Sequence, residues 1–123
     1  MTKNKIYISG PITGFNLEER RRFFSQMAEL AESIGFTPVN PFDNGLGPDA
    51  DYAAHMLADI KMLIECKAIL MLPDWDLSEG AKLELKVAVA CHIEILEVVT
   101  EWDKDDYTIQ PLLPKDIIDC LSS

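Results

Sequence analysis

The chain alternates between two hydrophobic patterns: short continuous apolar runs, and longer segments with an apolar stripe at helical spacing. The short runs predict four strands, at residues 5–9, 37–39, 68–72 and 93–99. The third run is apolar throughout, which is typical of a central strand in a parallel sheet. The striped segments predict helices at about 16–34, 52–64, 78–92 and 114–121.

The first predicted helix has the clearest boundaries and stripe. Asn16 is suited to cap its start, with Glu19 three residues later, and Gly35 is suited to end it. The apolar stripe is predicted to consist of Phe23, Met27, Leu30 and Ile34.

Strands that alternate with helices favour a parallel sheet covered by helices on both faces. A chain of 123 residues fits one domain and is short for two. We therefore predict a flavodoxin-like or Rossmann-like α/β fold in a single domain over residues 1–123, with a parallel sheet of four to five strands. Ligands of such sheets bind at the carboxyl ends of the strands, where loops 10–14, 40–51 and 73–80 are expected to meet.

Charge and cysteine content narrow the class of protein. The net charge of −10 disfavours binding to a nucleic-acid polymer, which usually needs a basic surface. The three cysteines are too widely spaced for a disulfide framework or a zinc site, and two lie in apolar stretches, which predicts reduced core thiols. No apolar run has the length of a signal peptide or a membrane span. We expect a cytoplasmic protein without a metal, a cofactor or a membrane partner.

Glu84 is the most unusual residue of the third predicted helix. Its helical neighbours Gly80, Ala81 and Ala88 are small or apolar, so its carboxylate is expected to be partly buried near the ligand-binding edge. The alternative is that Glu84 leans into solvent, as the flanking lysines do.

Two further residues carry weaker signals. Asp59 lies between apolar residues on the preceding helix, and a second carboxylate beside Glu84 would suit glycosidic chemistry; the alternative is an ordinary exposed Asp. Trp75 lies in a loop between two aspartates, where its ring could stack on a base or cover the edge of the core.

The loop Gly10-Pro11-Ile12-Thr13-Gly14 follows the first strand and precedes a helix. Its glycines allow a ligand to approach the backbone, although their spacing is not that of the dinucleotide-binding motif. Ser78 and Gly80 open the third helix, which offers an anion site, although Ser78 also fits a plain cap. The run Arg20-Arg21-Arg22 covers three helix faces and is interpreted as solvated rather than as a phosphate clamp.

These segments together resemble the nucleoside 2-deoxyribosyltransferase superfamily, and most closely a domain family of unassigned function common in phage and bacterial genomes. The resemblance covers most of residues 5–99. It lies in Ile6-Tyr7-Ile8-Ser9-Gly10-Pro11-Ile12, Asp59-Ile60, Leu72-Pro73-Asp74-Trp75 and Ser78-Glu79-Gly80-Ala81-Lys82-Leu83-Glu84. The Ser-x-Gly-x-x-x-Glu run is its most specific part. The chain departs from the superfamily pattern at Lys86, where a glycine is common, and lacks basic residues from Pro11 to Phe15.

The resemblance implies a role for each matching residue. Glu84 corresponds to the nucleophile, Tyr7 to the tyrosine that orients it, and Asp59 to an aspartate that faces the active site. Ser78 resembles a serine that contacts a 5′-phosphate in the nucleotide-hydrolysing branch. The residues expected to bind substrate are Ser9, Gly10, Pro11, Ile12, Gly14, Asp74, Trp75, Ser78 and Gly80.

The sequence thus predicts an enzyme that cleaves the N-glycosidic bond of a nucleoside or nucleoside monophosphate. Transfer to another base and hydrolysis both remain open, as does the identity of the base. Asp59, Asp74 or Asp76 could hold or protonate the base. The resemblance also implies a homo-oligomer, a dimer or larger. The alternatives are a non-catalytic nucleotide-binding module of the same fold and a phage–host interaction protein.

Overall fold

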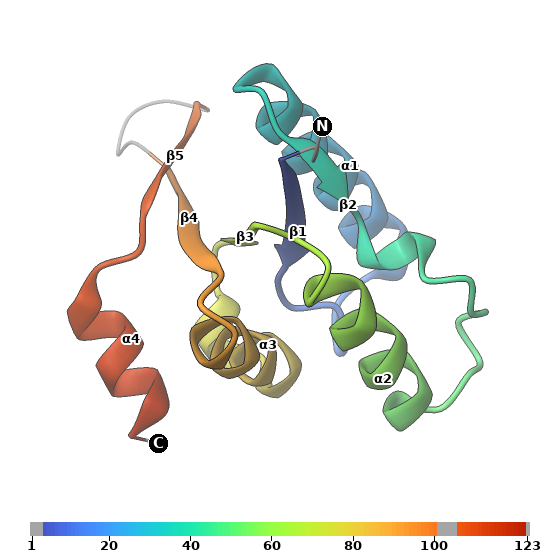
Figure 1. Cartoon of the computed structure of the whole chain (residues 1–123). Coiled ribbons are helices and arrows are strands. Elements are labelled where there is room, and N and C mark those ends of the chain that lie inside the picture. The colour runs from blue at the N-terminus through green and yellow to red at the C-terminus, as the bar shows by residue number, and fades with distance from the viewer. Residues whose placement is uncertain (1–3, 101–105, 123) are drawn as a thin grey trace.

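The computed structural model describes residues 4–100 and 106–122. Its elements along the chain are β1 (Lys5–Ser9), α1 (Leu17–Ser33), β2 (Thr37–Val39), the 3-10 helix η1 (Pro41–Asp43), α2 (Tyr52–Leu63), β3 (Ala68–Met71), the 3-10 helix η2 (Trp75–Leu77), α3 (Glu79–Ala90), β4 (Glu94–Thr100), β5 (Tyr107–Pro111) and α4 (Pro114–Leu121) (Figure 1).

The five strands form one sheet in the order β2-β1-β3-β4-β5. The first four strands run parallel, as predicted, whereas β5 pairs antiparallel with β4 and makes the sheet mixed. The sequence pattern did not locate β5, because this edge strand is largely exposed and lacks a continuous apolar run. The predicted α/β class and the sheet are confirmed.

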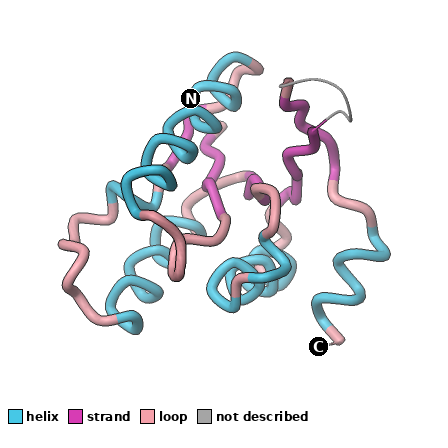
Figure 2. Tube along the Cα trace, turned by 180° about the vertical axis from the view of Figure 1, so that it is seen from behind, coloured by secondary structure: helices cyan, strands magenta, loops and turns pink. Residues whose placement is uncertain are grey.

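Helices cover both faces of the sheet. On one face, α1 packs against a core cluster that includes Ile6, Ile8 and Leu70. On the other face, α2, α3 and α4 pack against a second cluster that includes Tyr7 and Ile69. Figure 2, seen from behind, shows α1 in front of the strands, while α3 and α4 lie below the strands in this view.

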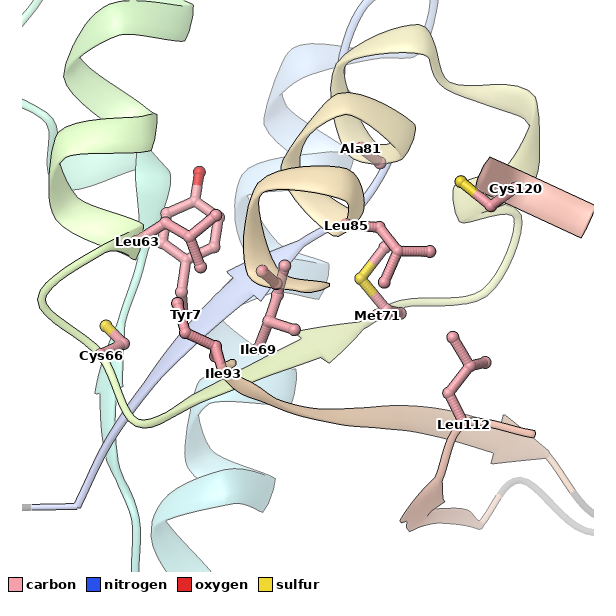
Figure 3. Close-up of a cluster of buried hydrophobic side chains, with 11 residues drawn as sticks. Tyr7, Leu63, Cys66, Ile69, Met71, Ala81, Leu85, Ile93, Leu112 and Cys120 are labelled. Atoms are coloured by element: carbon pink, nitrogen blue, oxygen red, sulfur yellow. The ribbon is translucent and has the colours of Figure 1, made fainter. Parts of the chain in front are cut away.

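Strand β1 supplies residues to both clusters because successive side chains of a strand point to opposite faces. Ile6 and Ile8 point toward α1, and Tyr7 points into the cluster beneath α2 and α3. In Figure 3 the Tyr7 ring rises from β1 beside Leu63, with its hydroxyl group directed away from the sheet. The alternation therefore gives β1 one purely apolar face and one face that carries polar groups toward α3.

The buried face of α1 is displaced from the predicted face by about one residue along the sequence. Phe24, Met27 and Ala31 are the buried positions. Phe23 and Leu30 only flank this stripe, and Ile34 caps the helix and is exposed. The predicted cap at the other end is confirmed, because Asn16 accepts a 3.0 Å hydrogen bond from the Glu19 backbone N–H. The buried positions of α1 share one core cluster with Ile6 and Ile8.

Cys66 and Cys120 are buried free thiols, while Cys91 is a free thiol at an exposed position. None of the helices in the described ranges combines the length and apolar character that a membrane crossing requires.

Candidate active site

Glu84 lies on the buried face of α3, together with Ala81, Leu85 and Ala88. Only 5% of Glu84 is exposed. Both carboxylate oxygens accept hydrogen bonds from β1: Oε2 from the Tyr7 hydroxyl at 2.5 Å, and Oε1 from the Ser9 hydroxyl at 2.7 Å. Tyr7 and Ser9 reach the same carboxylate because they are two residues apart on a strand and therefore share a face.

Burial raises the pKa of Glu84 to about 7. The hydrogen bonds from Tyr7 and Ser9 oppose this rise because they stabilise the charged form, while the nearby charge of Asp59 adds to it. A carboxyl group with a pKa near neutrality is common at catalytic sites.

Tyr7 is fully buried, and its pKa is raised well above the ordinary value of a tyrosine. The main cause is burial, followed by the negative charges of Glu84 and Asp59. The Tyr7 hydroxyl therefore keeps its proton at neutral pH and acts as a donor to Glu84.

Asp59 is the second buried carboxyl group, 8% exposed on α2. Its Oδ1 accepts a 2.9 Å hydrogen bond from the Asn44 side chain. Burial raises the pKa of Asp59, although the Asn44 hydrogen bond acts in the opposite direction, as does the positive charge of His55 when its ring is protonated.

A cleft of about 630 Å³ connects the two carboxyl groups. Its walls come from the loop after β1, the start of α1, the segment 41–56 and the first turn of α3. Tyr7, Asp59 and Glu84 all line it. The volume falls within the range of small-molecule sites. The arrangement therefore presents two carboxyl groups with raised pKa values to one ligand-sized space.

Comparison with known proteins assigns the chain to a family. The family described as "Domain of unknown function (DUF4406)" matches residues 4–97. The chain is a member of this family. A search of curated proteins returned no match.

Two solved structures show that this DUF4406 protein shares its fold with a deoxyribosyltransferase. It superposes with a TM-score of 0.62 and 22% identity on the 2-desoxiribosyltransferase from Leishmania mexicana, over 80% of this chain and 65% of that one. A conserved protein from Enterococcus faecalis V583 gives a TM-score of 0.61 and 22% identity, over 98% of this chain and 76% of that one. The DUF4406 chain thus spans about two thirds of the length of the deoxyribosyltransferase. The resemblance seen in the sequence is confirmed for the fold.

Many of the residues predicted for the site of this DUF4406 protein do gather at the cleft. Gly10, Pro11, Ile12, Ser78 and Gly80 line it together with the three predicted catalytic residues. Ser9 contacts Glu84 directly. Ser78 also caps α3, because its hydroxyl oxygen accepts a 3.1 Å hydrogen bond from the Ala81 N–H.

Four predicted binding residues lie outside the cleft lining: Ser9, which bonds to Glu84, and also Gly14, Asp74 and Trp75. Trp75 packs against the core cluster beneath α3, because the short helix η2 turns its ring toward the core. Asp74 is exposed at a left-handed turn with φ 67°, and Gly14 is exposed at a turn with φ 88°. Of the two readings of Trp75, the structure favours a cover over the core edge. Asp76 is also exposed and lies outside the cleft lining.

The two cleft glycines have structural reasons to lack a side chain. A Cβ at Gly10 would lie 2.9 Å from the Leu72 Cβ, so close strand packing requires this glycine. A Cβ at Gly80 would lie 3.1 Å from the Tyr52 hydroxyl oxygen and 3.3 Å from the Met56 sulfur. Gly80 thus allows α2 and α3 to approach where the cleft begins.

Sequence reasoning missed three polar residues of the cleft. Asn44 and His55 line it and are linked to Asp59, but a loop Asn and a lone His carry no distinctive pattern. Arg21 also lines it, with its guanidinium 4.8 Å from the Phe42 ring centroid. Arg21 shares a face of α1 with Leu17, another lining residue, but the sequence alone does not show that this face meets the cleft.

Arg20, the neighbour of Arg21, is not a simple solvated residue either. Its Nε donates a 2.8 Å hydrogen bond to the Pro11 carbonyl oxygen. Its guanidinium lies 5.0–5.5 Å from the ring centroids of Phe15, Phe23 and Phe24. Arg20 therefore ties the loop after β1 to α1. Within residues 4–100 and 106–122, no group of three or more His, Cys, Asp or Glu side chains is placed to hold a metal ion.

Proposed function

We propose that this protein cleaves the N-glycosidic bond of a deoxynucleoside or deoxynucleoside monophosphate, with Glu84 as the nucleophile. The observation that carries the proposal is the buried Glu84 carboxylate, which both Tyr7 and Ser9 orient inside a ligand-sized cleft. A structural carboxylate with the same hydrogen bonds would have no need to face such a space.

In the first step, a Glu84 carboxylate oxygen attacks C1′ of the sugar and forms a C1′–O bond. The C1′–N bond breaks, and its electron pair leaves with the base. Asp59 in its protonated form donates a proton to the departing base, which its raised pKa favours. The transition state carries positive charge on the sugar, so the negative charge of Glu84 stabilises it.

In the second step, water or a second base attacks C1′ from the side that the first base left. The C1′–O bond to Glu84 breaks, and its electron pair returns to the carboxylate. The Asp59 carboxylate accepts the proton of the attacking group and is ready for another cycle. Two displacements at the same carbon retain the configuration at C1′.

The structural likeness supports this chemistry, because one protein of the same fold is a 2-desoxiribosyltransferase. The net charge of −10 and the ligand-sized cleft support a small substrate rather than a nucleic-acid polymer. Arg21 is the cation best placed to meet an anionic group of such a substrate.

The test is incubation with a panel of deoxynucleosides and their 5′-monophosphates, with and without a second base, and with released base quantified by chromatography. We expect base release by the wild type and none by Glu84→Gln, because loss of a covalent nucleophile costs several orders of magnitude in rate. Glu32→Gln, at an exposed position of α1, is the matched control and should retain wild-type turnover. Ligand binding without base release would instead indicate the non-catalytic binding module.

A further inference from the structure

The Asn44 side chain joins Asp59 to His55. Its Nδ2 lies 2.9 Å from Asp59 Oδ1 and 3.0 Å from His55 Nδ1. Its Oδ1 accepts a 3.0 Å hydrogen bond from the Leu46 backbone N–H. On its other side, His55 Nε2 lies 3.0 Å from the Gly47 carbonyl oxygen. The loop after η1 is thus linked to α2 by the Asn44 amide and by the contact of His55 with Gly47.

Hydrogen-bond chemistry determines which atoms carry protons along the hydrogen-bonded series from Gly47 through His55 and Asn44 to Asp59. A carbonyl oxygen only accepts, so His55 Nε2 must carry the proton that it donates to Gly47. In neutral His55, Nδ1 is then an acceptor and takes one N–H of Asn44. The second N–H of Asn44 is left for Asp59 Oδ1. Every polar atom of the Asn44 side chain has a partner, so the amide cannot rotate without losing a hydrogen bond.

The hydrogen bond from Asn44 distinguishes the two carboxyl oxygens of Asp59. Oδ1 accepts from Asn44, and a carboxylic acid accepts best through its unprotonated oxygen, so Oδ2 is the favoured position for a proton on Asp59. Oδ2 has no hydrogen-bond partner among the described residues, and it is not among their buried unpaired atoms. Asp59 itself lines the cleft. The free oxygen is therefore the one that a ligand can meet.

We propose that Asn44 and His55 are positioning residues that hold the Asp59 carboxyl with Oδ2 as a proton donor toward the leaving base. This inference rests on the proposed function. Asn44 sets which oxygen carries the proton, and His55 sets the rotation of Asn44. The proton moves from Oδ2 to the base nitrogen as the C1′–N bond breaks, and it leaves Asp59 as a carboxylate that Asn44 still stabilises.

The experiment compares two kinds of leaving group. The first substrate is the deoxynucleoside that the wild type cleaves best. The second is its activated analogue, an N7-methylated purine or a 5-fluorinated pyrimidine deoxynucleoside, whose base leaves with little or no help from an acid. Loss of acid positioning slows the first substrate selectively, whereas a general loss of structure slows both substrates alike.

For Asn44→Ala we expect a roughly 10- to 100-fold loss of kcat/KM on the ordinary substrate, and a loss within about threefold on the activated one. Asn44→Ser is a second variant, because a serine hydroxyl can still accept from the Leu46 N–H but is too short to reach Asp59. It should show the same selectivity even if Asn44→Ala folds poorly.

His55 offers a matched pair of variants. The amide oxygen of His55→Asn can take the place of Nδ1 as acceptor for Asn44, whereas the longer His55→Gln reaches only toward Gly47. We expect His55→Gln to share the selective loss of Asn44→Ala, and His55→Asn to lie closer to the wild type. His92→Asn, at an exposed position between α3 and β4, is the control and should match the wild type on both substrates.

Equal losses on the two substrates, or no loss in the Asn44 variants, would overturn the inference while leaving Glu84-dependent cleavage in place. Absence of base release by the wild type from every substrate would overturn the proposed function and the inference together. Variants are compared only after their melting temperatures show that they are folded at the assay temperature.

Discussion

The Tyr7 hydroxyl donates a 2.5 Å hydrogen bond to Glu84 Oε2 between residues 77 positions apart in the chain. Ser9 makes the equivalent bond to Oε1. The first strand of the sheet therefore sets the position of a carboxylate on α3. Two consequences of this contact can be measured.

Removing either donor should move the pH dependence of activity upward. Tyr7→Phe and Ser9→Ala each delete a hydrogen bond that lowers the pKa of Glu84, so this pKa should rise above its value of about 7. Activity requires the Glu84 carboxylate, so the pH at which activity reaches half of its maximum should be higher in both variants than in the wild type. At pH 7 the loss should be about 10- to 100-fold, as expected for a hydrogen bond to a charged group. A pH profile of kcat/KM that keeps the wild-type midpoint would contradict the role of these donors.

Glu84→Gln should stabilise the protein, and increasingly so as the pH rises. Between the unfolded value of 4.5 and the folded value of about 7, the folded state binds more protons at Glu84 than the unfolded state. The stability that the neutral carboxyl contributes is complete below pH 4.5 and is lost as the pH rises through 7. Gln is neutral throughout, so its advantage should grow to the order of 3 kcal/mol above pH 7.

Denaturant unfolding of the wild type and Glu84→Gln at pH 5 and pH 8 measures this difference. The exposed Glu32→Gln change controls for the loss of a surface charge. An advantage of Glu84→Gln that is the same at both pH values would show that Glu84 does not titrate with a raised pKa.

Trp75→Ala should lower stability rather than affinity. The ring packs against the core cluster and lies outside the cleft lining. Because Trp75 is only partly buried, the cost should be about 2–3 kcal/mol, below that of a fully buried aromatic. Melting temperature and substrate affinity are measured on the same variant. A normal melting temperature with weakened binding would restore the stacking role.

The protein is expected to form a homo-oligomer, at least a dimer. Large apolar side chains remain exposed on several elements, among them Leu57 at 73%, Leu77 at 75% and Ile118 at 60%. Burying such residues against a second copy would remove apolar surface from water. Sedimentation equilibrium at micromolar concentration should give a multiple of 13.8 kDa. A mass of one chain would exclude the assembly.

The sequence revealed the parts of the site that lie on regular elements. Glu84 was found because a carboxylate stood out on a helical stripe of small residues, whereas Tyr7 was identified only through the resemblance of its strand to a known superfamily. The Glu84 signal is periodic, so it can be read from one chain. The class of the sheet followed in the same way from the alternation of strands and helices.

The missed residues depend on contacts that no local pattern records. Asn44 acts through side chains of α2 that lie 11 and 15 positions away. Arg21 could not be told from Arg20 or Arg22 until α1 had a fixed rotation on the sheet. Trp75 was predicted at the ligand edge because it follows a strand, but the turn at Asp74 directs the ring elsewhere.

The alternation along β1 also bears on how this protein can change over time. Ile6 and Ile8 touch only the cluster beneath α1, whereas Tyr7 and Ser9 serve the carboxylate on the opposite side. Substitutions in the first cluster can drift among apolar residues at a cost in stability alone. A library that varies Ile6, Ile8 and Phe24 among apolar residues should therefore yield many folded, active variants, whereas Tyr7→Phe and Ser9→Ala keep much of the packing and lose the hydrogen bonds to Glu84. Mutations that alter stability and mutations that alter substrate choice can therefore accumulate at different positions of this chain.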